Sequence, residues 1–102
     1  MRGKTMETTY DIIRRLAVDT LDVPEVILLR ARTLREAGID SLASLDLLSA
    51  IEAHFGIHIA AEELADLDSL RDFATLAERL IAREASRYEA YRDHPYEAHH
   101  EA

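Results

Sequence analysis

The sequence predicts an all-α fold, a four-helix bundle of three main helices and one short helix. Nearly half of the residues (48%) are apolar, and alanine and leucine dominate them. Apolar residues recur at helical spacing of i, i+3 and i+4. Only three glycines and two prolines leave little room for β-hairpins. A chain of 102 residues forms a single domain.

The first helix is expected from about Glu7 to Leu21, with Thr8 or Thr9 at its start. The residues expected on its buried side are Ile13, Leu16, Ala17 and Leu21. Pro24 then marks a loop. The connection over residues 23–37 is long, and we expect four apolar side chains to pin it to the bundle: Val26, Ile27, Leu29 and Leu34.

The second helix is expected from Ser41 to His54, ended by Gly56. Gly38 permits a turn before it, and either Asp40 or Ser41 can cap its first amide groups. The Ser41 hydroxyl then lies at a surface corner near the positive end of a helix, where a phosphate ester is favoured. The apolar face predicted for this helix contains Leu42, Leu45, Leu48, Ile51 and Phe55, widened by Leu47 and Ala50.

A short third helix is expected from Ala61 to about Leu67, and the last helix from about Ser69, extending as far as Ala90. Asp68-Ser69-Leu70 repeats the tripeptide Asp40-Ser41-Leu42, and Asp72 completes a pattern like a capping box. The tripeptide alone therefore does not separate a helix cap from an attachment site. The inward residues predicted for the last helix are Leu70, Phe73, Leu76, Leu80 and Ile81.

The formal net charge is −8, and its distribution is uneven. Residues 36–70 contain no lysine or arginine, while their acids are Glu36, Asp40, Asp46, Glu52, Glu62, Glu63, Asp66 and Asp68. This surface disfavours nucleic acid, because phosphates require cationic partners. It favours docking of partners with basic patches, although a solvated acidic face would have the same composition.

Several function classes find no support in the residues. Without cysteine there is no disulfide, thiolate metal site or cysteine nucleophile. No apolar run is long enough for a membrane span and no signal peptide is evident, so we expect a cytoplasmic protein. His54 and His58 resemble an i, i+4 metal pair, but Gly56 separates them and zinc needs more ligands, so no metal site is predicted. No acid-base set accompanies Ser41, so no catalytic residues are predicted.

Residues 34–59 resemble the acyl carrier protein family. Leu34 precedes Gly38 by four residues, Gly-x-Asp-Ser-Leu follows, Glu52 and Phe55 form an acid-x-x-Phe pattern, and Ile59 lies in a short loop. The resemblance covers residues 7–83, which we take as the carrier domain. Residues 1–6 are then a flexible N-terminus, and residues 84–102 an extended last helix and flexible tail.

The resemblance implies that a phosphopantetheinyl transferase places 4′-phosphopantetheine from coenzyme A on Ser41, with Asp40 associated with that step. The arm would carry an acyl or aminoacyl thioester from a loading ligase to synthase or transferase enzymes. The chain itself would be no enzyme, and nothing demands more than a monomer. The residues expected to recognise partners are Leu42, Leu45, Asp46 and Glu52.

Some positions depart from fatty-acid-synthesis carriers. Alanines stand at residues 43 and 53, where those carriers often have acids, and Arg30, Arg32 and Arg35 make the preceding connection unusually basic. These differences favour a specialised carrier for lipid, polyketide or nonribosomal-peptide chemistry. The alternative is an unmodified helical interaction module that uses this basic segment and the long last helix as contact surfaces.

Overall fold

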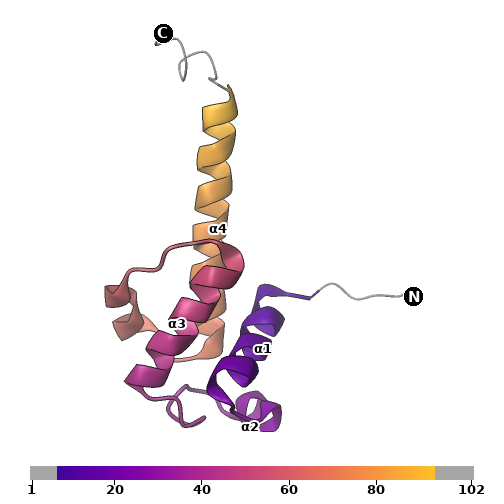
Figure 1. The fold of residues 1–102 in the computed structure, drawn as a ribbon, viewed down its shortest axis with the longest axis vertical. Helices are drawn as coiled ribbons and strands as arrows, with labels where there is room; N and C mark the ends of the chain where they lie inside the picture. Colours follow the sequence, from indigo (N-terminus) through magenta and orange to yellow (C-terminus); the bar gives the residue numbers. More distant parts are fainter. Residues whose placement is uncertain (1–6, 94–102) are drawn as a thin grey trace, which may run out of the picture.

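The computed structural model describes residues 7–93, with side chains placed as far as residue 90 (Figure 1). Its helices, in order, are α1 (Thr9–Leu21), α2 (Glu25–Arg30), α3 (Ser41–Phe55), the 3₁₀ helix η1 (Ala61–Asp66) and α4 (Leu70–Asp93). There is no β-strand within these residues, so the predicted all-α bundle is confirmed. The N-terminus expected at residues 1–6 and the tail over residues 94–102 lie outside this range.

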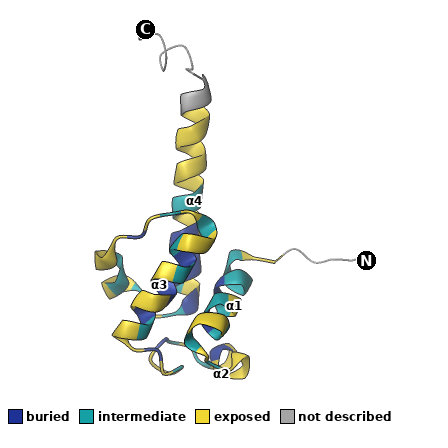
Figure 2. Cartoon of the chain, viewed as in Figure 1, coloured by how far each residue is buried: buried dark blue, intermediate teal, exposed yellow. Residues whose placement is uncertain are grey.

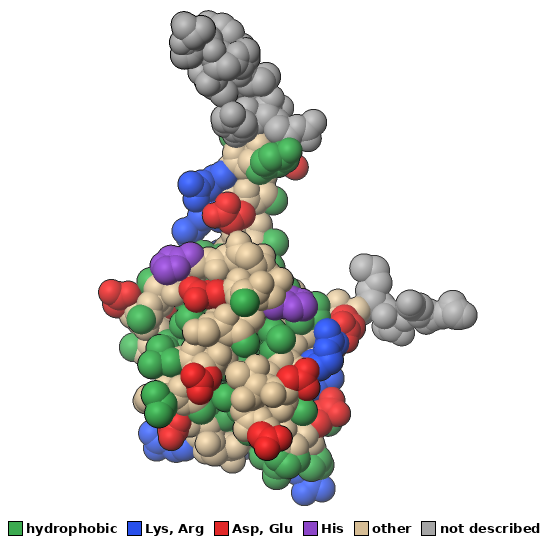
Figure 3. Space-filling view, in the orientation of Figure 1, with side chains coloured by type: hydrophobic (Ala, Val, Ile, Leu, Met, Phe, Trp, Pro, Cys, Tyr) green, Lys and Arg blue, Asp and Glu red, His purple; other side chains and the backbone are tan. Residues whose placement is uncertain are grey.

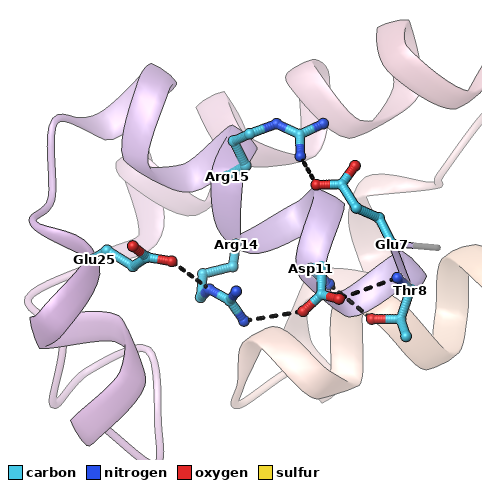
Figure 4. A network of polar contacts seen from close by, with 6 residues as sticks. All are labelled: Glu7, Thr8, Asp11, Arg14, Arg15 and Glu25. Carbon is cyan, nitrogen blue, oxygen red and sulfur yellow. Dashed lines mark hydrogen bonds and ion pairs between the residues drawn. The ribbon is translucent and has the colours of Figure 1, made fainter. Parts of the chain in front are cut away.

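Helix α1 begins as predicted with a threonine cap, and the cap is Thr8. The Asp11 amide donates to Thr8 Oγ1 (3.0 Å), and the Thr8 amide donates to Asp11 Oδ2 (3.1 Å), which forms a capping box (Figure 4). The contacts with Thr8, above all its backbone amide, favour the charged carboxylate. They therefore lower the pKa of Asp11. Ile13 and Ala17 are buried between α1 and the other main helices.

The connection after α1 contains a short helix that the sequence analysis missed. Arg14 in α1 ties α2 down through its Nε atom, 3.1 Å from Glu25 Oε2 (Figure 4). Leu28 is the residue of α2 that enters the core, with 3% exposure. The expectation that Val26, Ile27 and Leu29 pin this segment is wrong, since they are 52%, 40% and 58% exposed. One and a half turns of helix can direct only one side inward, and Leu28 occupies it.

Helix α3 ends as predicted at Gly56, whose φ of 68° is in the left-handed region that glycine adopts readily. Its predicted inward face is wrong at two positions, because Leu42 is 70% exposed and Leu45 is 42% exposed. Leucines and alanines of α3 point to most sides of the helix, so their periodicity alone does not select the buried face. Packing against α1 and α4 selects it, and the buried side chains are Ser44, Leu47, Leu48 and Ile51.

Helix α4 completes the core and then leaves it. Phe73 is fully buried, together with Leu70 and Leu76, as predicted. Leu80 and Ile81 are only partly buried because α4 extends past α1 and α3 at this level (Figure 2). The side chains of residues 82–90 are all exposed. The bundle therefore has one long projecting helix, and α2 lies at its opposite end (Figure 1).

Candidate functional site

Ser41 is placed by the loop that precedes α3. The Leu34 amide donates to the Asp68 carbonyl (2.7 Å), and the Ile39 amide donates to the Leu34 carbonyl (2.9 Å). Leu34 and Ile39 are both buried, so the loop is held at two points. Gly38 adopts a φ of 81° between them, a conformation that side chains disfavour. These contacts fix the chain immediately before Ser41.

Asp40, and not Ser41, caps α3. The Ala43 amide donates to Asp40 Oδ1 (2.9 Å), and Asp40 has the extended backbone of an N-cap residue. Ser41 is the first helical residue and is exposed. Its hydroxyl has no hydrogen-bond partner among residues 7–93. The two capping options left open by the sequence are thus resolved, and the Ser41 hydroxyl is available.

The repeated tripeptide at α4 behaves differently. The Asp72 amide donates to Ser69 Oγ (3.1 Å), and the amides of Asp68 and Ser69 donate to Asp72 Oδ2 (2.7 and 3.2 Å). This is the capping box that the sequence suggested. Ser69 therefore uses its hydroxyl for the helix start, whereas Ser41 does not. The same three residues have two different roles in one chain.

A cleft of about 710 Å³ opens beside Ser41. Ile39, Asp40, Ser41 and Ser44 form one side, and the loop residues Thr33, Leu34 and Arg35 form another. The remaining wall comes from Leu64, Ala65, Leu67 and Asp68 in and after η1. Sequence reasoning did not assign Arg35 or the η1 residues to this site. Arg35 comes from the loop before α3, and the packing of η1 against α3 brings the η1 residues to the same cleft. No spacing rule predicts this arrangement.

Three of the predicted site residues lie together. Asp40, Leu42 and Asp46 line a depression of about 320 Å³, which Leu21 and Ile39 also line. Figure 3 shows acidic and apolar side chains interspersed over the face on which α3 lies. Leu45 is also exposed on α3, but it is not part of this depression. The face combines charge with accessible apolar area.

Glu52 lies near the other end of α3. Its Oε2 atom accepts a hydrogen bond from the Ile59 amide (2.7 Å) and lies 3.4 Å from His58 Nδ1. These contacts fix the loop between α3 and η1, and they explain the spacing of Glu52 and Ile59 in structural terms. Recognition of partners by Glu52 stays a prediction.

The described part of the chain shows neither a metal site nor a membrane span. No group of three or more histidine, aspartate or glutamate side chains there could hold a metal ion. Within that range, too, none of the helices has the length and apolar character needed to cross a membrane.

Comparison with known proteins identifies the family of the chain. Residues 11–77 match the family described as phosphopantetheine attachment site. The helical fold and this match define a carrier domain with a phosphopantetheine attachment site. The chain belongs to the acyl carrier protein family. Its members carry acyl groups for partner enzymes and catalyse no step themselves, and 4′-phosphopantetheine is their prosthetic group.

Individual relatives are distant. The chain is 32% identical over 72 residues to an acyl carrier protein of Campylobacter hominis, which covers 70% of this chain and 91% of that protein. It is 33% identical over 76 residues to acyl carrier protein 3 of Ralstonia nicotianae, and the alignment covers 74% of this chain and 87% of that protein. It is 36% identical over 59 residues to acyl carrier protein AcpXL of Mesorhizobium japonicum, and the alignment covers 57% of this chain and 63% of that protein.

The residues at the start of α3 fit the prosthetic group. Attachment of a phosphodiester needs an accessible hydroxyl, and Ser41 is exposed, with no hydrogen bond of its hydroxyl to another described residue. The cleft beside it offers the Arg35 side chain, which forms no ion pair within residues 7–90, as a cation for the phosphate. Membership of the family implies two kinds of partner, a phosphopantetheinyl transferase and enzymes that handle acyl groups.

Proposed function

We propose that Ser41 is the attachment residue and that the chain is an acyl carrier protein of a specialised pathway. The carrying observation is the free, exposed hydroxyl of Ser41 at the start of α3, next to the large cleft. Ser69 occupies an equivalent sequence position, but its hydroxyl is already engaged by the Asp72 amide. The carrier domain in this proposal spans residues 7–83.

Each residue near Ser41 has a distinct role in this proposal. Asp40 holds the first turn of α3 through the Ala43 amide, which fixes the backbone at Ser41. Arg35 lines the same cleft as Ser41, and in this proposal its guanidinium pairs with the phosphate on Ser41. When bound, 4′-phosphopantetheine supplies a thiol that holds an acyl or aminoacyl group as a thioester. Leu34, Ile39 and Leu64 give the cleft an apolar lining for part of that cargo.

Partner enzymes would dock on the α3 face, which we define by Asp40, Leu42, Leu45 and Asp46. Leu42 and Leu45 are large apolar side chains left in water beside two acids, an arrangement suited to brief contacts with basic enzymes. The phosphopantetheinyl transferase, an acyl- or aminoacyl-loading ligase and downstream synthases would share this face. Brief docking fits a tethered substrate, because the tether raises its effective concentration at each enzyme.

The proposal of a specialised pathway rests on positions where the sequence departs from fatty-acid-synthesis carriers. The alanines at residues 43 and 53 thin the acidic character of α3, and the arginines at residues 30, 32 and 35 lie on or near α2. A carrier with such a surface would be a poor substitute for a general fatty-acid carrier, because partner choice follows charge complementarity.

Intact-mass spectrometry tests the proposal. The chain would be incubated with coenzyme A, Mg²⁺ and a broad-specificity phosphopantetheinyl transferase. We expect the parent and Ser69→Ala to gain one phosphopantetheine and Ser41→Ala to gain none. A gain in Ser41→Ala would refute Ser41 as the attachment residue. No gain in any sample with several transferases would favour the unmodified interaction module.

A further inference from the structure

Helix α2 leaves three large apolar side chains in water. Val26, Ile27 and Leu29 are 40 to 58% exposed, while Leu28 anchors the helix from below. The ion pair between Arg14 and Glu25 also holds α2 against α1, so the exposed side is a stable feature of the fold. A cluster of exposed apolar side chains on a folded domain marks a contact surface.

One of these three residues, Leu29, also lines a second cleft, of about 360 Å³. Leu28, Leu29 and Arg32 contribute to it from α2 and the following loop, Tyr10 from α1, and Ser69 and Arg71 from the start of α4. The Arg71 guanidinium carbon lies 4.3 Å from the centre of the Tyr10 ring, and this cation–π contact positions its charge at the cleft.

Arg32 and Arg71 line this cleft, and Arg30 is the last residue of α2. None of the three forms an ion pair within residues 7–90, although Arg14 and Arg15 on α1 both do. In a chain of net charge −8 these arginines stand out as a local excess of positive charge. Figure 3 shows basic and apolar side chains next to each other at the end of the molecule where α2 lies. The complementary surface must carry both carboxylates and apolar groups.

We propose that the α2 face, defined by Val26, Ile27, Leu29, Arg32 and Arg71, docks an acidic, apolar segment of a partner protein. A carboxylate of that segment would enter the cleft between Arg32 and Arg71, and its apolar side chains would cover α2. The concave cleft favours a protein segment over a lipid surface, which would contact a convex tip.

The position of the α2 face suggests what docking there would do. Thr33 and Leu34 line both this cleft and the cleft beside Ser41, so the two sites share one wall. A partner on the α2 face would lie next to the attachment residue, while the α3 face stays open for enzymes with basic patches. The chain would then have two docking surfaces of opposite charge. This proposal does not require Ser41 to be modified.

Fluorescence anisotropy with the unmodified chain tests it. The probe is a labelled peptide that combines glutamates with leucines on one helical face, and the matched control peptide has lysines in place of the glutamates. We expect the acidic peptide alone to bind, with affinity falling as salt increases. Amide chemical-shift changes should map to residues 10, 29, 32, 69 and 71. Binding of both peptides, or of neither, would overturn the proposal.

Charge reversal provides the sharper comparison. Arg32→Glu with Arg71→Glu should weaken acidic-peptide binding about tenfold or more. The matched control, Arg79→Glu with Arg83→Glu, changes the net charge equally at two exposed arginines of α4 that also lack an ion pair within residues 7–90. We expect that control to bind nearly as well as the parent. Equal losses in the two double variants would mean a general charge effect and would overturn the proposal.

A third variant tests the apolar part. Val26→Ser with Leu29→Ser changes only exposed side chains, so circular dichroism should show an intact fold, and peptide affinity should fall.

Two further measurements test other occupants of the α2 face. Binding to phosphatidylglycerol vesicles tests a membrane, and light scattering tests a second copy of the chain. Vesicle binding without peptide binding would assign the face to a membrane. A dimer of the parent that Arg32→Glu with Arg71→Glu dissociates would assign it to a second copy of the chain.

Discussion

The contrast between the two Asp-Ser-Leu tripeptides makes a quantitative prediction about stability. Ser69 Oγ accepts the Asp72 amide, but Ser41 Oγ has no partner among the described residues because Asp40 already caps α3. Replacing each serine by alanine should therefore have unequal effects, although the local sequences are nearly the same. The comparison also separates a loss of attachment chemistry from a loss of folding.

The magnitudes follow from the hydrogen bonds. Removing a serine N-cap costs about 1 kcal/mol, so Ser69→Ala should lower the free energy of unfolding by about that amount. Asp40→Ala should cost a similar ~1 kcal/mol because the Ala43 amide loses its acceptor. Ser41→Ala removes no hydrogen bond, and alanine is the better helix former, so its effect should stay within about 0.5 kcal/mol.

Urea unfolding followed by far-ultraviolet circular dichroism measures all three variants. For a domain of this size, ~1 kcal/mol also corresponds to about 4–8 °C in the thermal midpoint. The slope of free energy against urea should be unchanged, since no variant alters the surface exposed on unfolding. If Ser41→Ala is as destabilised as Ser69→Ala, Ser41 is a cap, and the argument that its hydroxyl is free for attachment fails.

Three other predictions follow from the packing and the polar contacts. Phe73→Ala empties a fully buried position and should cost about 3–5 kcal/mol by the same urea assay; a cost below about 1 kcal/mol would mean that Phe73 does not lie in the core. The lowered pKa of Asp11 means that its contribution to stability is present above its ordinary value of 3.8 and is lost as pH falls through the lower folded value. Asp11→Asn should therefore be less stable than the parent near neutral pH, and the difference should shrink in acid; a constant difference would contradict the capping box. Leu42→Asp should leave stability nearly unchanged because the side chain is exposed, yet slow modification by the transferase; unchanged modification kinetics would remove Leu42 from the docking face.

Local rules explain why much of this fold was readable from the sequence. The helix starts at Thr8 and Ser69 follow from side chains that satisfy nearby amides, and the end of α3 follows from the left-handed backbone that Gly56 permits. The placement of Ser41 at the start of α3 comes from the same rules. Each of these depends on residues within four positions of one another.

The failures concern which way an element faces. In α3 apolar residues occur around most of the helix, so only the packing of α1 and α4 decided that Leu47 and Ile51 are buried while Leu42 and Leu45 meet solvent. In α2 four successive residues are apolar, so no helical periodicity indicates which of them is buried. In the structure only Leu28 of these four enters the core.

The sequence by itself determined the starts of α1, α3 and α4, the family and the serine at the head of α3, because caps, turns and spacing are local. The sequence left open whether Asp40 or Ser41 caps α3, and the structure shows that Asp40 does so through the Ala43 amide. Tertiary packing decided which residues share a cleft. It alone brought Arg35 and Leu64 into one cleft, and Tyr10 and Arg71 into the other. These groups come from separate elements, and their proximity depends on how the helices pack, which no local pattern encodes.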